Sequence, residues 1–421
     1  MNRPNILLII SDHVAWHQHQ ALSDFSLELP AWQQFVSEGC QFPRAYTISP
    51  LCTPARASMM TGEYPSRHGL RWNTESRFLG GVCDFTEDQK LYSDYLKEAG
   101  YINAYIGKWH CGGDKIPSDF GIEGWSEPHY GQPYTTGTYL EYLKQRSLPE
   151  PKGHIEKRLV QPHNKETFQL GKDLPMTEYM DASGVMSGPK EIHHDHFVSQ
   201  LVIDKLNEFK HKETPWSLVA SYWGPHHAYF PTEPFSGNID PLSIPQYPSF
   251  QEDLKNKPFR YTLQDNRHKA RQAWPEWSDW QPVMARAFEQ QQQTDHAIGQ
   301  ILETLEINGQ KDNTLVIWVS DHGDSLGSHG GLWNKASNFT EEVARIPLAI
   351  RWPEKVKAST NDSIVSNIDV TATMLQAADI AVPDSMTSQS LFNIKQDSLI
   401  CEHNGHDTTL VQRILIDGHL K

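Results

Sequence analysis

Short apolar segments recur along this chain, and polar residues that bind metals or anions follow each one at once. The segments are 5–10, 101–106, 216–222 and 314–319. Their β-branched and aromatic content is typical of strands inside a parallel sheet, which are covered on both faces. Helical patterns lie between them, at 30–39, 93–99, 192–209, 283–307 and 364–378. This alternation predicts the α/β class, with a large, mostly parallel sheet sandwiched by helices.

The residues that follow these segments are candidates for a functional site. They are Asp12 and His13, Lys108 and His110, His226 and His227, and Asp321 and His322. In open α/β sheets the ligand site lies at the carboxyl ends of the strands, so we expect these side chains to lie close together. A lone Asp after a strand often only caps the following helix. Four polar strand ends in one chain favour a shared site over four separate structural roles.

A further stretch, Cys52-Thr53-Pro54-Ala55-Arg56, predicts a thiol at the start of a short helix. Pro54 fits a first helical turn, and Gly62 is a suitable C-terminal stop. At a helix N-terminus the free backbone N–H groups favour an anion, and Arg56 adds a cation one turn later. The spacing alone leaves two interpretations open: a reactive cysteine, or a cysteine buried under a loop.

Composition limits the partners that we expect. The 421 residues carry a formal net charge of −15, which argues against a nucleic-acid binder with its basic face. The five cysteines are odd in number and irregularly spaced, so they predict neither a disulfide framework nor a zinc ribbon. The run 5–10 is too short to span a membrane and is followed by no signal-peptide cleavage site. We therefore expect no membrane association and a cytoplasmic location; the sequence does not indicate the oligomeric state.

The stretch from Cys52 to Gly62 resembles, without a gap, the signature of the type I, formylglycine-dependent sulfatases of the alkaline phosphatase superfamily. In that family a maturation enzyme oxidises the cysteine to formylglycine, and the hydrated aldehyde is the nucleophile. A second stretch, from Ser320 to Gly330, resembles the family's Ser-Asp-His-Gly element. The resemblance extends over nearly the whole chain. It implies an alkaline-phosphatase-like fold and a sulfuric ester hydrolase.

The resemblance also implies one divalent metal beside the nucleophile. Asp12 and Asp321 match its carboxylate ligands, His322 matches a position that the family fills with Asn or His, and Cys52 contributes the modified residue. His13 replaces the second residue of a common Asp-Asp pair, so its role as a ligand stays open. Calcium is the usual metal of the family and prefers oxygen ligands. Two histidines would shift the preference toward manganese or zinc.

The catalytic residues implied by the resemblance supply the nucleophile, bind the sulfate or move protons. They are Cys52, Arg56, Lys108, His110, His226 and Lys335. In the family, the two lysines hold the sulfate, His226 protonates the leaving oxygen, and His110 assists the breakdown of the covalent intermediate. Ala228 stands where the family usually has a second Pro, so the preference for His226 over His227 is open to test. The extra Gly331 leaves the placement of Lys335 open, and Asp324 and His329 are expected to support the site.

We expect a catalytic domain over 1–355 and a small C-terminal subdomain over 356–421, which family members usually continue further. Two segments rich in Gly, Pro, Trp and His, 112–190 and 230–282, show little periodicity. They are expected to be irregular and to frame the pocket. Ring-bearing residues in or beside these segments include Trp125, Tyr130, Tyr134, His193, His194, Trp274, Trp277 and Trp280. These rings either face the substrate or simply pack the segments.

Aromatic faces suit sugar rings, so the first expectation for the substrate is a sulfated mono- or oligosaccharide. A small alkyl or aryl sulfate is an alternative. The same fold and formylglycine also serve phosphonate monoester hydrolases and phosphodiesterases, which the histidines at 13 and 322 would suit. Two more distant alternatives are a phosphatase, which would carry Ser or Thr at position 52, and a sugar-binding relative whose Cys52 stays a thiol.

Overall fold

The computed structural model describes residues 3–418 except for 21, 23, 75–83, 159–169, 177–181, 256–269, 336–337 and 406–410. Cys83 and parts of the segments 112–190, 230–282 and 356–421 therefore lie outside the described residues. The described cysteines, Cys40, Cys52, Cys111 and Cys401, are buried free thiols. Among the described residues, no helix is both long and apolar enough to cross a membrane.

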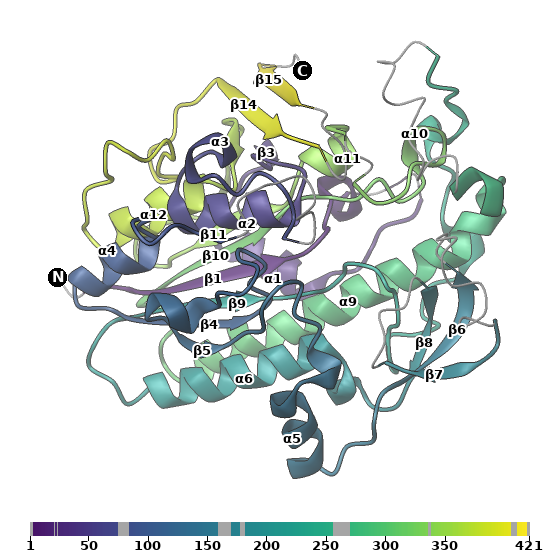
Figure 1. Ribbon diagram of the computed structural model, residues 1–421, viewed down its shortest axis with the longest axis horizontal. Coiled ribbons are helices and arrows are strands. Elements are labelled where there is room, and N and C mark those ends of the chain that lie inside the picture. The colour runs from purple at the N-terminus through teal and green to yellow at the C-terminus, as the bar shows by residue number, and fades with distance from the viewer. Residues whose placement is uncertain are drawn as a thin grey trace.

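An eight-stranded sheet forms the centre of the molecule, with the strand order β12-β2-β11-β10-β1-β9-β4-β5 (Figure 1). Its strands are β1 (Asn5–Ser11), β2 (Cys40–Gln41), β4 (Ile102–Gly107), β5 (Glu123–Trp125), β9 (Trp216–Ser221), β10 (Thr314–Ser320), β11 (Leu348–Arg351) and β12 (Ser359–Thr360). The strands from β10 to β5 run parallel, whereas β11 is antiparallel to β10 and to β2. The predicted α/β class with a mostly parallel sheet is confirmed.

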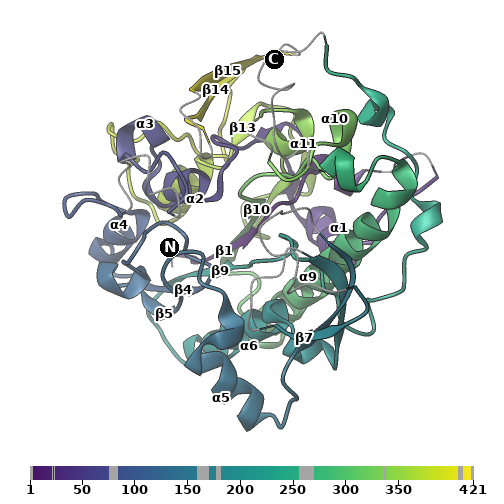
Figure 2. The ribbon, with the colours of Figure 1, turned by 45° about the vertical axis from the view of Figure 1, so that its right-hand side comes forward.

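Helices cover both faces of this sheet, because successive side chains of a strand point to opposite faces. From β1, Leu7 and Ile9 join the core on one side, under α1 (Pro30–Glu38), α6 (His194–Phe209) and α9 (Trp277–Ile307). Its alternate residues, Ile6, Leu8 and Ile10, join the core on the other side, under α2 (Cys52–Thr61), α4 (Tyr92–Glu98) and α12 (Asp369–Ala377). Both ribbon views show these two layers (Figures 1 and 2).

Helix α2 begins at Cys52 and is buried along its whole length. Leu51 before it is extended, with φ −133° and ψ 142°. Gly62 ends the helix in the left-handed conformation, with φ 71°, and donates its N–H to the carbonyl of Ser58 at 2.9 Å. The predicted helix with Cys52 at its start and Gly62 at its stop is confirmed.

The prediction of irregular structure over 112–190 is wrong for much of the segment. It contains α5 (Gly137–Gln145) and an antiparallel sheet in the order β7 (Asp173–Pro175), β6 (Lys152–Arg158), β8 (Ala182–Ser187). Over 230–282, described residues form only short 3-10 turns and a short helical stretch at 270–273 until α9, which begins six residues before the expected start at 283. Pro282 lies inside this helix. It removes one backbone donor, and the burial of Trp277 and Trp280 continues the helix on its N-terminal side.

The chain ends in an antiparallel hairpin of β14 (Ser398–His403) and β15 (Gln412–Asp417). Its inner face, with Leu399, Cys401 and Ile416, packs on Tyr46 and Ile48 in a third, smaller core. Figure 2 shows the hairpin at the top of the molecule near α3 (Pro65–His68). The remaining elements are η1 (Trp16–His19), β3 (Ala45–Tyr46), η3 (Pro117–Phe120), η4 (Pro133–Thr135), η5 (Lys190–Ile192), η6 (Pro241–Ser243), η7 (Pro248–Gln251), α10 (Ser328–Gly331), α11 (Glu341–Ala344) and β13 (Val365–Ser366).

Candidate active site

The four polar strand ends lie at one edge of the sheet. The strands β10, β1, β9 and β4 are consecutive neighbours and run parallel, so their carboxyl ends meet. The peptide that follows each strand continues this alignment: the N–H of Asp12 donates to the carbonyl of Gly224 at 3.1 Å, and the N–H of Asp321 donates to the carbonyl of Ser11 at 3.1 Å. The expectation that these strand ends meet at one edge is confirmed.

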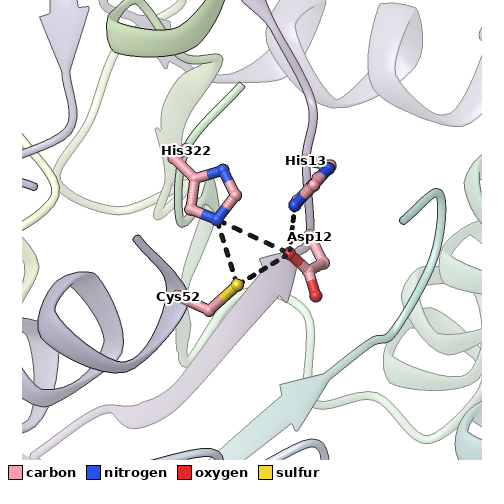
Figure 3. A group of neighbouring side chains, drawn as sticks. All are labelled: Asp12, His13, Cys52 and His322. Atoms are coloured by element: carbon pink, nitrogen blue, oxygen red, sulfur yellow. Dashed lines mark hydrogen bonds and ion pairs between the residues drawn. The ribbon is translucent and has the colours of Figure 1, made fainter. Parts of the chain in front are cut away.

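Four of the predicted residues form one buried cluster, which Figure 3 shows. It consists of Asp12, His13, Cys52 and His322, and one ligand atom from each lies within 4.8 Å of the others. The thiol of Cys52 is 3.2 Å from Nε2 of His322 and 4.0 Å from Oδ1 of Asp12. Nε2 of His13 and Nε2 of His322 each lie 4.0 Å from that same carboxylate oxygen.

Hydrogen bonds on the far side of both imidazoles determine which nitrogen faces the cluster. Nδ1 of His322 donates to the carbonyl of Gly323 at 2.9 Å, and Nδ1 of His13 donates to Oδ2 of Asp324 at 3.1 Å. Both Nε2 atoms are thereby left as lone-pair donors toward Cys52 and Asp12. Burial lowers the pKa of His13 well below its usual value and that of His322 to about 4, so both rings are neutral.

The cluster fits a divalent metal. Nε2 of His13 is buried and has no hydrogen-bond partner among the residues that the structure describes, although it points at a carboxylate. Such an orphaned atom costs free energy unless a ligand satisfies it. One carboxylate, two neutral imidazoles and the atom at position 52 are a suitable donor set for one ion.

Two buried cations stand beside the cluster. Lys108 pairs through Nζ with Oδ2 of Asp12, and Arg56 lies with Nη2 3.7 Å from that same oxygen. Arg56 also donates through Nε to Oδ2 of Asp321 at 2.9 Å and through Nη1 to the hydroxyl of Ser221 at 2.7 Å. Burial alone would raise the pKa of Asp12, but Lys108, His226, Arg56 and His322 hold it well below its usual value. Asp12 is therefore an ionised carboxylate in a positive environment.

The structure places Asp321 beside the four-residue cluster and not inside it. Its Oδ1 accepts the backbone N–H groups of His13 at 3.3 Å and His322 at 2.8 Å, and its Oδ2 lies 3.8 Å from Nε2 of His322. Lys335 is buried and donates through Nζ to Oδ1 of Asn334 at 3.3 Å. Its charge contributes to the lowered pKa values of His13 and His322, after the larger effect of burial.

The loop after β9 brings both candidate proton donors to this edge. The ring centroid of His226 lies 3.9 Å from that of His13, and the ring of His227 lies 5.7 Å from it. Nδ1 of His226 donates to the carbonyl of His227, which leaves its Nε2 for the site. Burial lowers the pKa of both rings, that of His227 to about 3. His110 is buried with its ring 5.7 Å from that of Tyr130.

The outcome for the predicted ring-bearing residues is divided. Trp274, Trp277 and Trp280 are buried in the core around α9. Four others, Tyr130, Tyr134, His193 and His194, line a pocket that also contains His226 and His227. The first set therefore packs the fold, whereas the second set adjoins the site.

Asp195 is a residue that the sequence reasoning missed. Its Oδ1 accepts the N–H of Gly224 at 3.2 Å, and its Oδ2 accepts the hydroxyl of Thr294 at 2.7 Å. Since the carbonyl of Gly224 accepts the N–H of Asp12, Asp195 supports the peptide that connects the two strand ends. The only local signal for Asp195 is its place in the first turn of α6, which indicates a helix cap.

Comparison with known proteins gives a consistent result along the chain. A family model described as Sulfatase matches residues 4–380. The chain is 28% identical over 408 residues to an uncharacterized sulfatase of Escherichia coli, YidJ, and this match covers 94% of this chain and 72% of the relative. It is 25% identical over 430 residues to the N-acetylglucosamine-6-O-sulfatase of Bacteroides thetaiotaomicron, covering 92% of this chain and 70% of the relative.

Solved structures agree on the fold. The phosphonate monoester hydrolase of Silicibacter pomeroyi superposes with a TM-score of 0.76 at 19% identity, over 95% of this chain and 79% of that one. At this identity the similarity establishes the architecture alone.

Proposed function

This chain belongs to the sulfatase family, whose members hydrolyse sulfate esters, and we propose that it cleaves a sulfate monoester of a mono- or oligosaccharide. The observation that supports this most is the cluster of Asp12, His13 and His322 around Cys52 at the start of α2. In the proposed reaction the ester O–S bond breaks, the hydroxyl of water ends on sulfur, and a proton ends on the alcohol. The sulfated-carbohydrate class is supported by the activity in the name of the Bacteroides relative.

Two groups would complete the site. Formylglycine made from Cys52 by a maturation enzyme would, as its hydrate, supply the nucleophile. A divalent metal held by Asp12, His13 and His322, with Asp321 beside them, would polarise the sulfate and neutralise charge. Calcium is the first candidate, with manganese or zinc favoured by the two imidazoles.

The cations of this chain would hold the sulfate. Lys108 is fixed against Asp12 and lies with Nζ 4.2 Å from the ring centroid of Tyr130. Arg56 is anchored through Asp321 and Ser221, so its charge is preorganised and needs no movement during the reaction. Lys335 approaches from the loop after β10. These three charges would stabilise the oxyanions that develop on the sulfate.

The histidines would move the protons. His226 has its Nδ1 hydrogen engaged by the carbonyl of His227, so its Nε2 would pass a proton to the departing alcohol oxygen. His110, on the neighbouring strand end, would remove a proton from the hydroxyl that remains at position 52.

Mass spectrometry of the peptide that contains Cys52, after expression with a maturation enzyme, tests the modification. We expect the mass of the aldehyde or its hydrate and turnover of 4-nitrophenyl sulfate. Cys52→Ala should abolish turnover, whereas Cys40→Ala, which changes another buried thiol, should retain it. An unmodified and fully active Cys52 would contradict the proposed nucleophile.

A phosphonate monoester or phosphodiester is the second candidate substrate, since two imidazoles face Cys52. The ratio of kcat/KM for 4-nitrophenyl sulfate to that for 4-nitrophenyl phenylphosphonate separates the two functions. We expect the ratio to favour sulfate. A small alkyl or aryl sulfate as the best substrate would retain the reaction and change the substrate class.

A further inference from the structure

A pocket lies beside His226, which is one of its lining residues. Its cavity volume is about 30 Å³, and the pocket opens to solvent. Tyr130 marks its border with the site: Nζ of Lys108 lies over the Tyr130 ring, and the His226 ring lies 5.5 Å from it. Tyr134 and Trp223 are buried walls, whereas Tyr130 and Gln132 are half-buried at the mouth. A cavity of this size holds only a few water molecules, so a ring would rest across its mouth with one face against the walls.

His194 is the most fixed polar group of this pocket. Its Nδ1 lies 3.0 Å from Oδ1 of Asp195, which is fully buried and anchored by Gly224 and Thr294. The Nδ1 hydrogen is therefore donated to the carboxylate, and Nε2 is left as the atom that a ligand can reach. The His194 ring is stacked on Tyr134, at 5.5 Å and 6°, and on Trp223, at 6.2 Å and 26°.

Neighbouring bonds keep these walls in place. The indole Nε1 of Trp223 donates to the carbonyl of Tyr130 at 2.9 Å, and the hydroxyl of Tyr134 accepts the N–H of His194 at 3.4 Å. The wall around His194 is thus held by α6, by the loop after β9 and by the segment 130–134. A ligand would meet a preformed surface, which lowers the entropy cost of binding.

The charge of the pocket selects the class of ligand. Of the described residues that line it, none is Lys, Arg, Asp or Glu. Among these described lining residues, a second anionic group of a substrate would find no fixed cation, and an ammonium group would find no carboxylate. Aromatic faces together with the imidazoles and the Gln132 amide suit a neutral ring that carries hydroxyl groups.

Building on the proposed function, we propose that this pocket binds one neutral pyranose ring of the substrate and that His194 determines its specificity. The ring lies against the aromatic walls with its sulfate directed toward Cys52, and one of its hydroxyl groups donates a hydrogen bond to Nε2 of His194. The inference concerns recognition only, because His194 takes no part in the proton transfers assigned to His110 and His226.

Binding is measured by calorimetry in a Cys52→Ala background, so the result does not depend on formylglycine or turnover. The probes are neutral monosaccharides with one sulfate at O2, O3, O4 or O6, together with 4-nitrophenyl sulfate and choline sulfate. At least one sugar sulfate should bind, and His194→Ala should weaken its affinity about tenfold or more. His194→Gln, which keeps a hydrogen-bonding group, should recover part of the loss, and binding of 4-nitrophenyl sulfate should change less than about twofold.

His154→Ala is the matched control, because His154 also pairs with a carboxylate, Asp173, at 2.8 Å but lies in the β6–β7 sheet outside the pocket. In the formylglycine-bearing enzyme, His194→Ala should lower kcat/KM for the sugar sulfate, mainly through KM, about tenfold more than it lowers kcat/KM for 4-nitrophenyl sulfate. Equal losses for sugar and aryl esters, no effect of His194→Ala, or choline sulfate as the tightest ligand would each overturn the inference. Sugar binding without any hydrolysis would instead contradict the proposed function.

Discussion

A single carboxylate, that of Asp324, determines how His13 meets the candidate metal site. Its Oδ2 accepts Nδ1 of His13 at 3.1 Å and the hydroxyl of Tyr229 at 3.2 Å. Histidines that bind metals usually have such a partner on the other ring nitrogen, which sets the tautomer and the ring angle. The expected supporting role of Asp324 therefore has a specific form: it directs Nε2 of His13 toward Asp12.

Asp324→Ala should weaken metal affinity about 10- to 100-fold, because the His13 ring would lose its fixed tautomer and orientation. The affinity is measured by calorimetric titration of the metal-free protein with calcium, manganese and zinc. Tyr229→Phe is the control, since it removes the other partner of Asp324 and leaves the bond to His13. An unchanged affinity in Asp324→Ala would exclude His13 as an oriented ligand.

A side chain at position 224 is expected to disturb the site, because Gly224 is closely packed against Asp195 and Thr294. A Cβ at this position would lie 2.0 Å from Oδ2 of Asp195 and 2.5 Å from Oγ1 of Thr294. Gly224→Ala should therefore displace the loop that carries His226, lower kcat for 4-nitrophenyl sulfate at least about tenfold, and lower the free energy of unfolding by about 1–3 kcal/mol. Urea unfolding and steady-state kinetics measure the two effects.

Gly137→Ala is the comparison for this substitution, because Gly137 lies in α5 and a Cβ there would meet no atom within 4 Å. It should leave activity unchanged and stability unchanged or slightly higher. Wild-type turnover in Gly224→Ala would show that the position of this peptide does not limit the reaction.

At the scale of elements, His329 connects three short segments. Nδ1 lies 2.7 Å from Glu252, which follows η7, and Nε2 lies 3.0 Å from Glu342 in α11, while His329 itself belongs to α10. Burial alone would lower the pKa of His329, but its bonds to Glu342 and Glu252 raise it above the ordinary 6.5. The histidine is thus a cationic bridge between two carboxylates.

This bridge makes stability depend on pH. Because the folded pKa of His329 is raised, its stabilising effect is complete below the ordinary value and is lost as pH rises through the folded value. His329→Gln should therefore lower the free energy of unfolding by about 1–2 kcal/mol near pH 5.5 and by clearly less near pH 9. Urea unfolding of both proteins at the two pH values measures the difference, and an equal loss at both would contradict a charged bridge.

The strands that end at the site could be predicted because each is a continuous apolar run, which a parallel strand buried on two faces requires. The sheet of β6, β7 and β8 could not, because β6 reads Lys-Gly-His-Ile-Glu-Lys-Arg and has a single large apolar residue, Ile155. Antiparallel pairing along the surface tolerates such a composition. The first turns of α9 were missed because Pro282 resembles a helix start, whereas burial of Trp277 and Trp280 extends the helix past it.

The residues of the candidate site could be named from their place after strands, since sheet order brings those places together. The residues that orient these side chains could not be predicted, because such residues lie on other elements and reach the site only through packing. Asp195 lies on α6 and contacts Gly224 on the loop after β9. No local pattern joins the two positions, and the same holds for Arg56 and Ser221.

For the molecule as a whole, the hairpin of β14 and β15 tests whether the chain unfolds as one unit. Leu399 and Ile400 are adjacent in β14 and point to opposite faces: Leu399 is 4% exposed in the third core, and Ile400 is 49% exposed. Glu402 further joins the hairpin to the body through the N–H and hydroxyl of Ser66. These contacts predict a hairpin that melts together with the central sheet.

Leu399→Ala should lower the free energy of unfolding by about 2–4 kcal/mol and shift a single calorimetric transition, because it leaves a cavity between the hairpin and the body. Ile400→Ala, its exposed neighbour, should cost less than about 0.5–1 kcal/mol. A separate low-temperature transition in Leu399→Ala, with the main transition unmoved, would show that the hairpin is an independent unit.

The order of strands in the central sheet also governs synthesis of the chain. β1 is made first but lies between β9 and β10, and the contact between Ser11 and Ser320 joins residues 309 positions apart. At about 5–20 residues per second, β10 leaves the ribosome about 15–60 s after β1. The apolar residues of β1 lack a neighbouring strand until β9 is made, about 10–40 s after β1, and one edge of β1 stays open to other chains until β10 follows. A lower growth temperature or an additional chaperone should therefore raise the yield of folded protein. Substitutions that only stabilise the finished fold should raise it less.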